Sequence, residues 1–97
     1  MSSLEQIKDN ILTIKPYLIN KYFINSIYIF GSFAREEQTN KSDLDILVDF
    51  QKTPDLLTFI EMEEYLSKQL DNNVDLVPKR KLKEQLKDMI LKEAIYI

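Results

Sequence analysis

The chain of 97 residues contains no cysteine and no histidine. Without cysteine it can form neither a disulfide framework nor a thiolate metal site. Without histidine it lacks imidazole zinc sites, Ser-His-Asp triads and the commonest general base. Any chemistry must therefore depend on carboxylates, hydroxyls, amines or a bound metal ion.

Positive charge and long apolar runs are also scarce. Thirteen basic residues stand against 16 acidic ones, giving a net charge of −3, whereas nucleic-acid-binding proteins usually present a basic face. Direct nucleic-acid binding is therefore not expected. The N-terminal sequence MSSLEQIKDN lacks the basic and apolar regions of a signal peptide, and no apolar run approaches membrane-spanning length. We expect a cytoplasmic protein that does not interact with membranes.

The composition is that of a folded globular domain. Hydrophobic residues make up 44% of the chain and charged residues 30%, which is typical of such domains. The length predicts a single domain over residues 1–97 with a two-layer core. Because little chain is left for a second lobe, we expect another molecule to supply the other half of any functional site.

The first half of the chain predicts one helix and two strands. Ser2 and Glu5 form an S-x-x-E capping box ahead of apolar residues at helical spacing, so a helix should begin at about Ser3 and end or kink at Pro16. The apolar run 27–30 should be a short buried strand that leads into a turn and a short helix. A second strand should cover 44–50.

The second half predicts two more helices around a third strand. Thr53 as N-cap and Pro54 at the first helical position should open a helix. The sequence NVDLVP reads as a strand that stops at Pro78, and apolar residues from Leu82 to Ile90 mark a last helix. This order predicts an α/β (α+β) domain, with a small mixed sheet and helices mainly on one face.

Three aspartates are candidates for a metal site. Asp43 and Asp45 lie two apart, so in a strand they share one face, roughly 6.6 Å apart along the chain. Asp75 occupies the same kind of position in the next strand, between apolar neighbours. Adjacent carboxylates repel each other unless a cation neutralises them, and Mg²⁺ binds carboxylate oxygens together with substrate phosphates. An isolated D-x-D pair can equally face solvent.

Gly31 is the only glycine of the chain, and Ser32 follows it. Without a Cβ atom, a glycine at the start of a short helix lets backbone N–H groups approach a phosphate, and the serine hydroxyl adds a donor. The segment GSFAREEQ is not a P-loop, because it lacks the second glycine and the lysine. A plain strand-to-helix turn is the alternative interpretation of the Gly-Ser pair.

The combined pattern resembles the nucleotidyltransferase superfamily with the DNA polymerase β fold. The residues that carry the resemblance are the blocks IFGSFAR and SDLDILVDF, followed by VDLV and the terminal EAIYI. They look like the minimal nucleotidyltransferases, or MNT-domain proteins, and the resemblance covers nearly the whole chain. It implies attack of a hydroxyl on the α-phosphate of ATP, with pyrophosphate leaving.

The resemblance also implies a role for individual residues. Gly31 and Ser32 would bind the triphosphate, and Arg35 and Ser42 are further candidates for nucleotide binding, with a surface role as the alternative for Arg35. Asp43 and Asp45 would hold two Mg²⁺ ions. Asp75 would complete the site by binding the catalytic metal or by activating the acceptor hydroxyl.

The chain departs from the family pattern at one position. Such proteins often read Ala-Arg-Gly after the Gly-Ser pair, whereas this chain has Glu36 in the place of the glycine. The glutamate is expected to alter the loop geometry and adds negative charge near the phosphate site. It affects none of the three aspartates.

Two further groups of residues have open roles. The basic residues Lys79, Arg80, Lys81 and Lys83 could be a solvated face or could contact triphosphate or an acidic partner. Aromatic residues could belong to the core or to an adenine pocket, with the core favoured; they are Phe23, Tyr28, Phe30, Phe50 and Phe59.

Minimal nucleotidyltransferases are commonly paired with HEPN-domain ribonucleases as antitoxin and toxin. The resemblance therefore suggests transfer of AMP to a tyrosine of a HEPN toxin, in a hetero-oligomer with that partner, with a homodimer as an alternative when the chain is alone. A non-catalytic antitoxin that neutralises its partner stoichiometrically is a second hypothesis. Transfer to a small molecule such as an antibiotic is a third.

Overall fold

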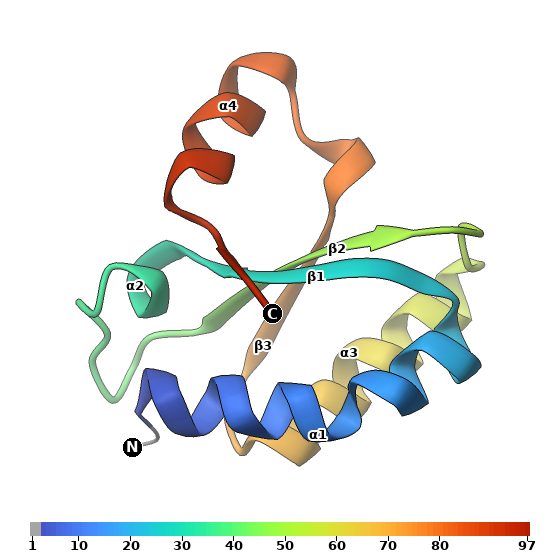
Figure 1. Cartoon of the computed structure of the whole chain (residues 1–97), viewed down its shortest axis with the longest axis horizontal. Helices are drawn as coiled ribbons and strands as arrows, with labels where there is room; N and C mark the ends of the chain where they lie inside the picture. Colours follow the sequence, from blue (N-terminus) through green and yellow to red (C-terminus); the bar gives the residue numbers. More distant parts are fainter. Residues whose placement is uncertain (1–2) are drawn as a thin grey trace.

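A computed structural model describes residues 3–97 and shows helices and strands in alternation (Figure 1). The elements in chain order are α1 (Leu4–Tyr22), β1 (Ile24–Phe30), α2 (Gly31–Ala34), β2 (Leu44–Phe50), α3 (Leu56–Leu70), β3 (Val74–Pro78), the 3₁₀ turn η1 (Lys79–Lys81), α4 (Glu84–Glu93) and β4 (Ile95–Tyr96). No helix within residues 3–97 is long and apolar enough to cross a membrane.

The strands form one mixed sheet in the order β3-β2-β1-β4. β1 is antiparallel to both β2 and β4, and β2 is parallel to β3. Helices α1 and α3 lie on one side of the sheet and α4 on the other, as Figure 1 shows. The predicted fold class is confirmed.

The hydrophobic core lies between the sheet and the helices α1 and α3. Alternate residues of β2 point into it, and Leu44, Ile46 and Val48 are fully buried, as the sequence predicts. Apolar residues at helical spacing on α1 and α3 meet them, among them Ile7, Ile11, Leu18, Met62 and Leu66. The residues of β2 between these positions therefore point to the other face of the sheet.

Helix α1 differs from the prediction at both ends. Ser2, the predicted cap, lies outside the described residues; the N-cap is Ser3, which forms a capping box with Gln6. The helix continues through Pro16 to Tyr22 instead of ending there. Pro16 and Leu12 are both exposed, so water can reach the Leu12 carbonyl that the proline leaves without its helical partner.

Other element boundaries also needed correction. Helix α3 is capped by Asp55, not Thr53, because the Asp55 carboxylate accepts a hydrogen bond from the Thr58 N–H at 2.8 Å. This bond lowers the pKa of Asp55. β1 begins at Ile24, three residues earlier than predicted, and the two-residue strand β4 was not predicted.

Side chains of α3 cover the outer edge of β3. The Val74 N–H donates to Ser67 Oγ at 3.0 Å, and the Leu76 N–H donates to Glu63 Oε2 at 2.9 Å. Ser67 Oγ in turn donates to the Glu63 carbonyl. These bonds fix the position of β3, the strand that carries Asp75.

Candidate active site

The three predicted aspartates meet on the face of the sheet opposite α1 and α3. In the parallel pairing of β2 and β3, Asp45 and Asp75 are direct partners. Asp45 is half-buried and Asp75 is exposed at the edge. Asp43 is exposed and directly precedes the first residue of β2, so it approaches Asp45 from the start of the strand.

Asn73 fixes the position of Asp43. Its side-chain amide donates to Asp43 Oδ1 at 2.9 Å, and its backbone carbonyl accepts from the Leu44 N–H at 2.8 Å. Asn73 immediately precedes β3, so this pair joins the starts of two neighbouring strands. Asn73 was not predicted to have a role. Its position directly before the strand that carries Asp75 is the only sequence feature that could have indicated one.

The surroundings of Asp45 raise its pKa. Burial raises the pKa of Asp45, the negative charges of Asp75 and Asp43 raise it further, and the Arg35 guanidinium lowers it. The three carboxylates are thus close enough to repel one another. Such an arrangement is costly unless positive charge compensates it.

Gly31 is required by the position of Asp45. Its φ is +72°, in the left-handed region that favours glycine. A Cβ atom at this position would overlap the Asp45 carboxylate, lying 3.0 Å from its Cγ. The absence of a side chain at Gly31 was predicted to let a phosphate approach the backbone. In the structure, the group that lies against Gly31 is the Asp45 carboxylate.

The serines predicted to bind nucleotide have different surroundings. Ser32 lies in α2 and is half-buried; its carbonyl accepts from the Glu37 N–H at 2.9 Å, which closes the turn after α2. Ser42 Oγ accepts from the Thr39 N–H at 2.9 Å. The Ser42 hydroxyl therefore stabilises the loop that leads into β2.

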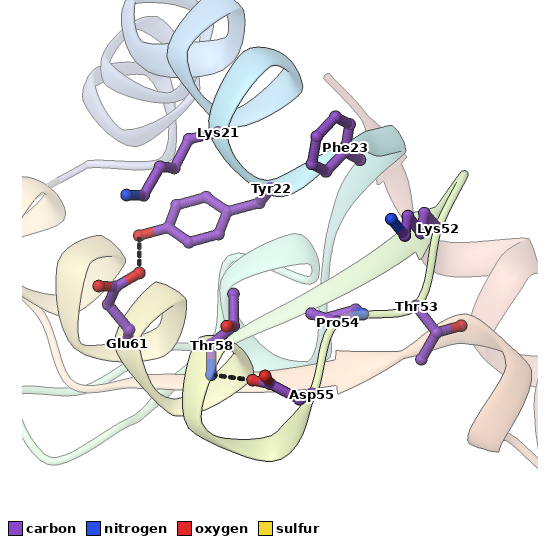
Figure 2. Close-up of a pocket in the computed structure, with 9 residues that line it drawn as sticks. All are labelled: Lys21, Tyr22, Phe23, Lys52, Thr53, Pro54, Asp55, Thr58 and Glu61. Carbon is purple, nitrogen blue, oxygen red and sulfur yellow. Dashed lines mark hydrogen bonds between the residues drawn. The ribbon is translucent and has the colours of Figure 1, made fainter.

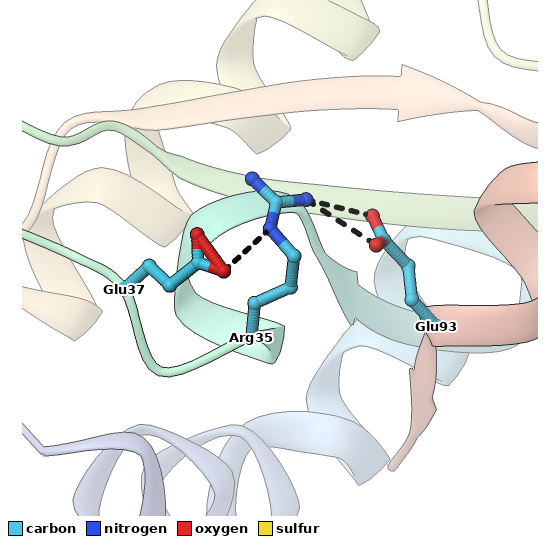
Figure 3. A network of polar contacts seen from close by, with 3 residues as sticks. All are labelled: Arg35, Glu37 and Glu93. Atoms are coloured by element: carbon cyan, nitrogen blue, oxygen red, sulfur yellow. Dashed lines mark hydrogen bonds and ion pairs between the residues drawn. The ribbon is translucent and has the colours of Figure 1, made fainter.

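Arg35 lies at the end of α2 and links it to the C-terminal helix. Its Nη1 contacts both carboxylate oxygens of Glu93, at 3.1 and 3.3 Å, and its Nε lies 3.5 Å from Glu37 Oε1 (Figure 3). The guanidinium is thereby held between two carboxylates close to Asp45. The sequence analysis did not anticipate the role of Glu93, which lies 58 residues further along the chain.

Glu36 adopts the backbone conformation that explains why glycine is common at this position in the family. Its φ is +56°, again in the left-handed region. The N–H of Glu36 donates to the Phe33 carbonyl at 3.1 Å, so the turn closes as a glycine would close it. The departure from the family pattern therefore places a residue with a Cβ atom in a conformation that favours glycine.

The carboxylates fit Mg²⁺ in kind, since hard cations prefer oxygen ligands and mutually repelling carboxylates favour a bound cation. In the part of the chain that the structure describes, no three acidic side chains converge closely enough to hold an ion. One Asp43 oxygen is engaged by Asn73. Binding of Mg²⁺ would thus require these side chains to rotate toward one another.

A cavity of about 440 Å³ lies at the opposite end of the sheet (Figure 2). Its lining includes Lys21, Tyr22, Lys52 and Glu61. Tyr22 Oη donates to Glu61 Oε2 at 3.1 Å, and burial together with this bond raises the pKa of Tyr22 well above its ordinary value. The cavity adjoins the end of β2, whereas Asp43 and Asp45 lie at its start, so it is separate from the candidate site.

The aromatic residues divide between the core and the surface. Phe50 is buried and Phe59 packs against the core. Phe23 is 50% exposed, so the favoured core alternative does not hold for it; it ends α1 in a left-handed conformation. Tyr28 and Phe30 are half-buried on the face of the aspartates, and Lys79 Nζ lies 5.5 Å from the Tyr28 ring centroid.

Comparison with known proteins agrees with this geometry. Residues 13–97 match the family model "Polymerase beta, Nucleotidyltransferase". The chain belongs to this family of nucleotidyltransferases. A protein of Thermococcus cleftensis named protein adenylyltransferase MntA is 42% identical over 97 residues, covering 100% of this chain and 98% of its relative.

Two solved complexes share the fold of this nucleotidyltransferase. A toxin–antitoxin crystal structure with AMP-PNP superposes with a TM-score of 0.75 at 30% identity, covering 91% of this chain and 69% of that chain. One chain of a complex between a tri-AMPylated HEPN toxin of Shewanella oneidensis and an MNT antitoxin superposes with a TM-score of 0.70 at 26% identity. The match covers 96% of this chain and 70% of that chain. The activity is therefore nucleotidyl transfer.

Proposed function

We propose that this nucleotidyltransferase transfers AMP from ATP to a protein hydroxyl, the acceptor being a tyrosine of a HEPN ribonuclease toxin. The observation that carries the proposal is the alignment of Asp45 with Asp75, beside Asp43 and directly against Gly31. Relatives named protein adenylyltransferase and an AMPylated HEPN toxin in a related complex support it.

The acceptor hydroxyl attacks the α-phosphorus of ATP. A bond forms between the acceptor oxygen and the α-phosphorus, the bond to the bridging oxygen of the β-phosphate breaks, and pyrophosphate leaves. Asp75 is exposed at the edge of the sheet, and it would take the proton of the hydroxyl. Gly31 and Ser32 would position the triphosphate at the turn after β1.

Asp43, Asp45 and Asp75 would hold two Mg²⁺ ions. When bound, the ions would supply positive charge that offsets the charge of the triphosphate and of the carboxylates. Arg35 would add positive charge on the same side as Asp45, provided that its pairing with Glu93 and Glu37 leaves a donor free.

The competing function is stoichiometric neutralisation of the partner without catalysis. The raised pKa of Asp45 argues against it, because three repelling carboxylates reduce stability and a binding surface does not require them. Transfer to a small molecule would require substrate-binding structure beyond the one sheet and the helices that residues 3–97 form.

The deciding experiment is incubation with α-labelled ATP, Mg²⁺ and the neighbouring gene product as the candidate partner. We expect label on the partner with the wild type and none with Asp43→Asn/Asp45→Asn. Asp49→Asn is the matched control, because Asp49 lies on the same strand and face but pairs with Asn25 away from the site. Neutralisation that survives the double substitution, without label, would establish the binding protein instead.

A further inference from the structure

The segment 79–93, here called the C-terminal arch, comprises η1, Leu82, Lys83 and α4. It rises from the sheet on the side away from α1 and α3 (Figure 1). None of the ten residues of α4 is buried. Its apolar side chains Leu86 and Met89 are 48% and 68% exposed. The arch thus presents an apolar helix face that the rest of the chain does not cover.

The arch also carries most of the positive charge that the chain leaves unpaired. It contains six basic and three acidic residues, a net charge of +3 in a chain whose total is −3. None of these six basic side chains forms an ion pair with any residue in the range 3–97. Four of them precede α4, where the helix dipole disfavours positive charge, so nothing within the described chain compensates this cluster.

Both ends of the arch contact the face of the sheet that carries the aspartates. Lys79 follows β3, the strand of Asp75, and lies over Tyr28. At the other end, Glu93 pairs with Arg35, and β4 then pairs with β1. A molecule bound to the arch would therefore lie over the same face of the sheet as the carboxylates.

Contact with the triphosphate does not account for the basic cluster. Arg80 and Lys81 line a cavity of about 370 Å³ together with Phe50 and Leu56. This cavity adjoins the end of β2 that is remote from Asp45. Leu56 is 73% exposed there, so apolar surface also lies beside these two basic residues.

We propose that the C-terminal arch is the docking surface for the acceptor protein, and that it binds a surface made of apolar side chains flanked by acidic ones. The inference rests on the proposed function, in which the acceptor is a hydroxyl of another protein. The uncompensated positive charge selects an acidic partner surface, and Leu86 and Met89 supply the apolar contact. A second copy of this chain would cover the arch without delivering an acceptor hydroxyl.

The apolar part of the proposal is tested with Leu86→Glu and Met89→Glu, which keep good helix formers in α4. Leu12→Glu is the matched control, since Leu12 is 53% exposed on α1, on the other side of the sheet. Binding to the neighbouring gene product is measured by calorimetry, and the transfer rate by label. We expect each arch variant to raise Kd and the KM for the acceptor at least about tenfold, with the KM for ATP unchanged, and the control to change neither.

The charge part is tested with Arg80→Glu/Lys81→Glu, against Lys21→Glu/Lys68→Glu as control. We expect slower association and a weaker salt dependence for the arch variant only. Unchanged Kd in the arch variants while the partner is still labelled would overturn the docking surface and leave the proposed function intact. Loss of a homodimer in sedimentation, with acceptor binding unchanged, would also overturn it.

The same measurements distinguish failure of the proposed function from failure of the docking surface. If the wild type binds the partner without labelling it and the arch variants lose that binding, the docking surface holds and the transfer is refuted. If the wild type does not bind the partner at all, both are refuted.

Discussion

Gly31 and Asp45 lie so close together that no side chain fits between them. A Cβ atom on Gly31 would be 3.0 Å from Asp45 Cγ and 3.2 Å from Asp45 Cβ, and would overlap the carboxylate. Gly31 follows β1 directly, and Asp45 is paired with Phe30, the last residue of that strand, so neither backbone can withdraw easily. The turn that is expected to receive the triphosphate and a carboxylate expected to bind metal therefore constrain each other.

Gly31→Ala should lower both stability and activity. The left-handed φ costs about 1–2 kcal/mol for a residue with a Cβ atom, and the displaced Asp45 carboxylate should reduce transfer at least about tenfold. Chemical denaturation and labelling of the acceptor measure the two effects. In the background Asp45→Ala, which removes the overlap, the same substitution should cost only the backbone part; an equal cost in both backgrounds would show that the overlap is unimportant.

Asp45→Asn should raise the stability of the protein while abolishing transfer. Its raised pKa means that the folded state holds the ionised carboxylate less well than the unfolded state does. Stability should therefore rise as the pH falls through the folded pKa of Asp45, and the neutral amide should stabilise the fold at neutral pH. Thermal unfolding without Mg²⁺ checks this. A decrease in stability would mean that the carboxylate accepts bonds worth more than the repulsion it causes.

Glu36→Gly should stabilise the loop after α2. Glycine adopts the observed φ of +56° without the steric penalty of a Cβ atom. The net gain should be up to about 1 kcal/mol, because glycine also makes the unfolded chain more flexible. Glu36→Ala separates the effects, since it removes the charge and keeps the Cβ atom. Equal stabilisation by alanine would assign the cost to the charge of Glu36 and not to its backbone.

Arg35→Ala should affect nucleotide binding more than folding. The pair of Arg35 with Glu93 is partly exposed, with side chains 44% and 33% accessible, and such pairs contribute little to stability. If Arg35 contacts the triphosphate, the substitution raises the KM for ATP, whereas Glu93→Gln, which weakens the hold on the guanidinium, lowers it. Steady-state kinetics with varied ATP checks both. The same KM in all three proteins would restrict Arg35 to a structural role.

Glu63→Ala should destabilise β3. It removes the acceptor of the Leu76 N–H, and a buried donor left without a partner costs about 1–3 kcal/mol. Glu63→Gln retains an acceptor oxygen and should cost less than half as much. Denaturation curves give the two values, and hydrogen exchange at Leu76 should accelerate in the alanine variant alone.

Local patterns were sufficient to predict most of the fold. β2 was predicted with its observed boundaries and β3 with its observed end, because alternating burial leaves Leu44, Ile46 and Val48 on one face, with aspartates between apolar residues. Pro78 marks the end of β3. The site residues Asp43, Asp45 and Asp75 were placed together for the same reason, since the strand period fixes which residues share a face.

Contacts between distant parts of the chain could not be predicted in this way. The pairing of Arg35 with Glu93, and of Asn73 with Asp43, depends on how α4 and the start of β3 pack, and neither has a local signal. The two residues of β4 are too few to show a period. At Pro16 the rule that proline ends a helix was overridden, because α1 continues to bury Leu18 and Tyr22 beyond it.

The hydrogen bonds from Val74 and Leu76 to Ser67 and Glu63 have a consequence for how this protein can associate. An edge strand with free N–H groups is a template onto which a strand of another polypeptide can add. Here those donors are already used by the chain's own α3, so intermolecular extension of the sheet past β3 is blocked. A partner that reaches Asp75 must therefore recognise side chains and not the backbone of β3. For the same reason, the β3 edge cannot act as a template for fibril growth.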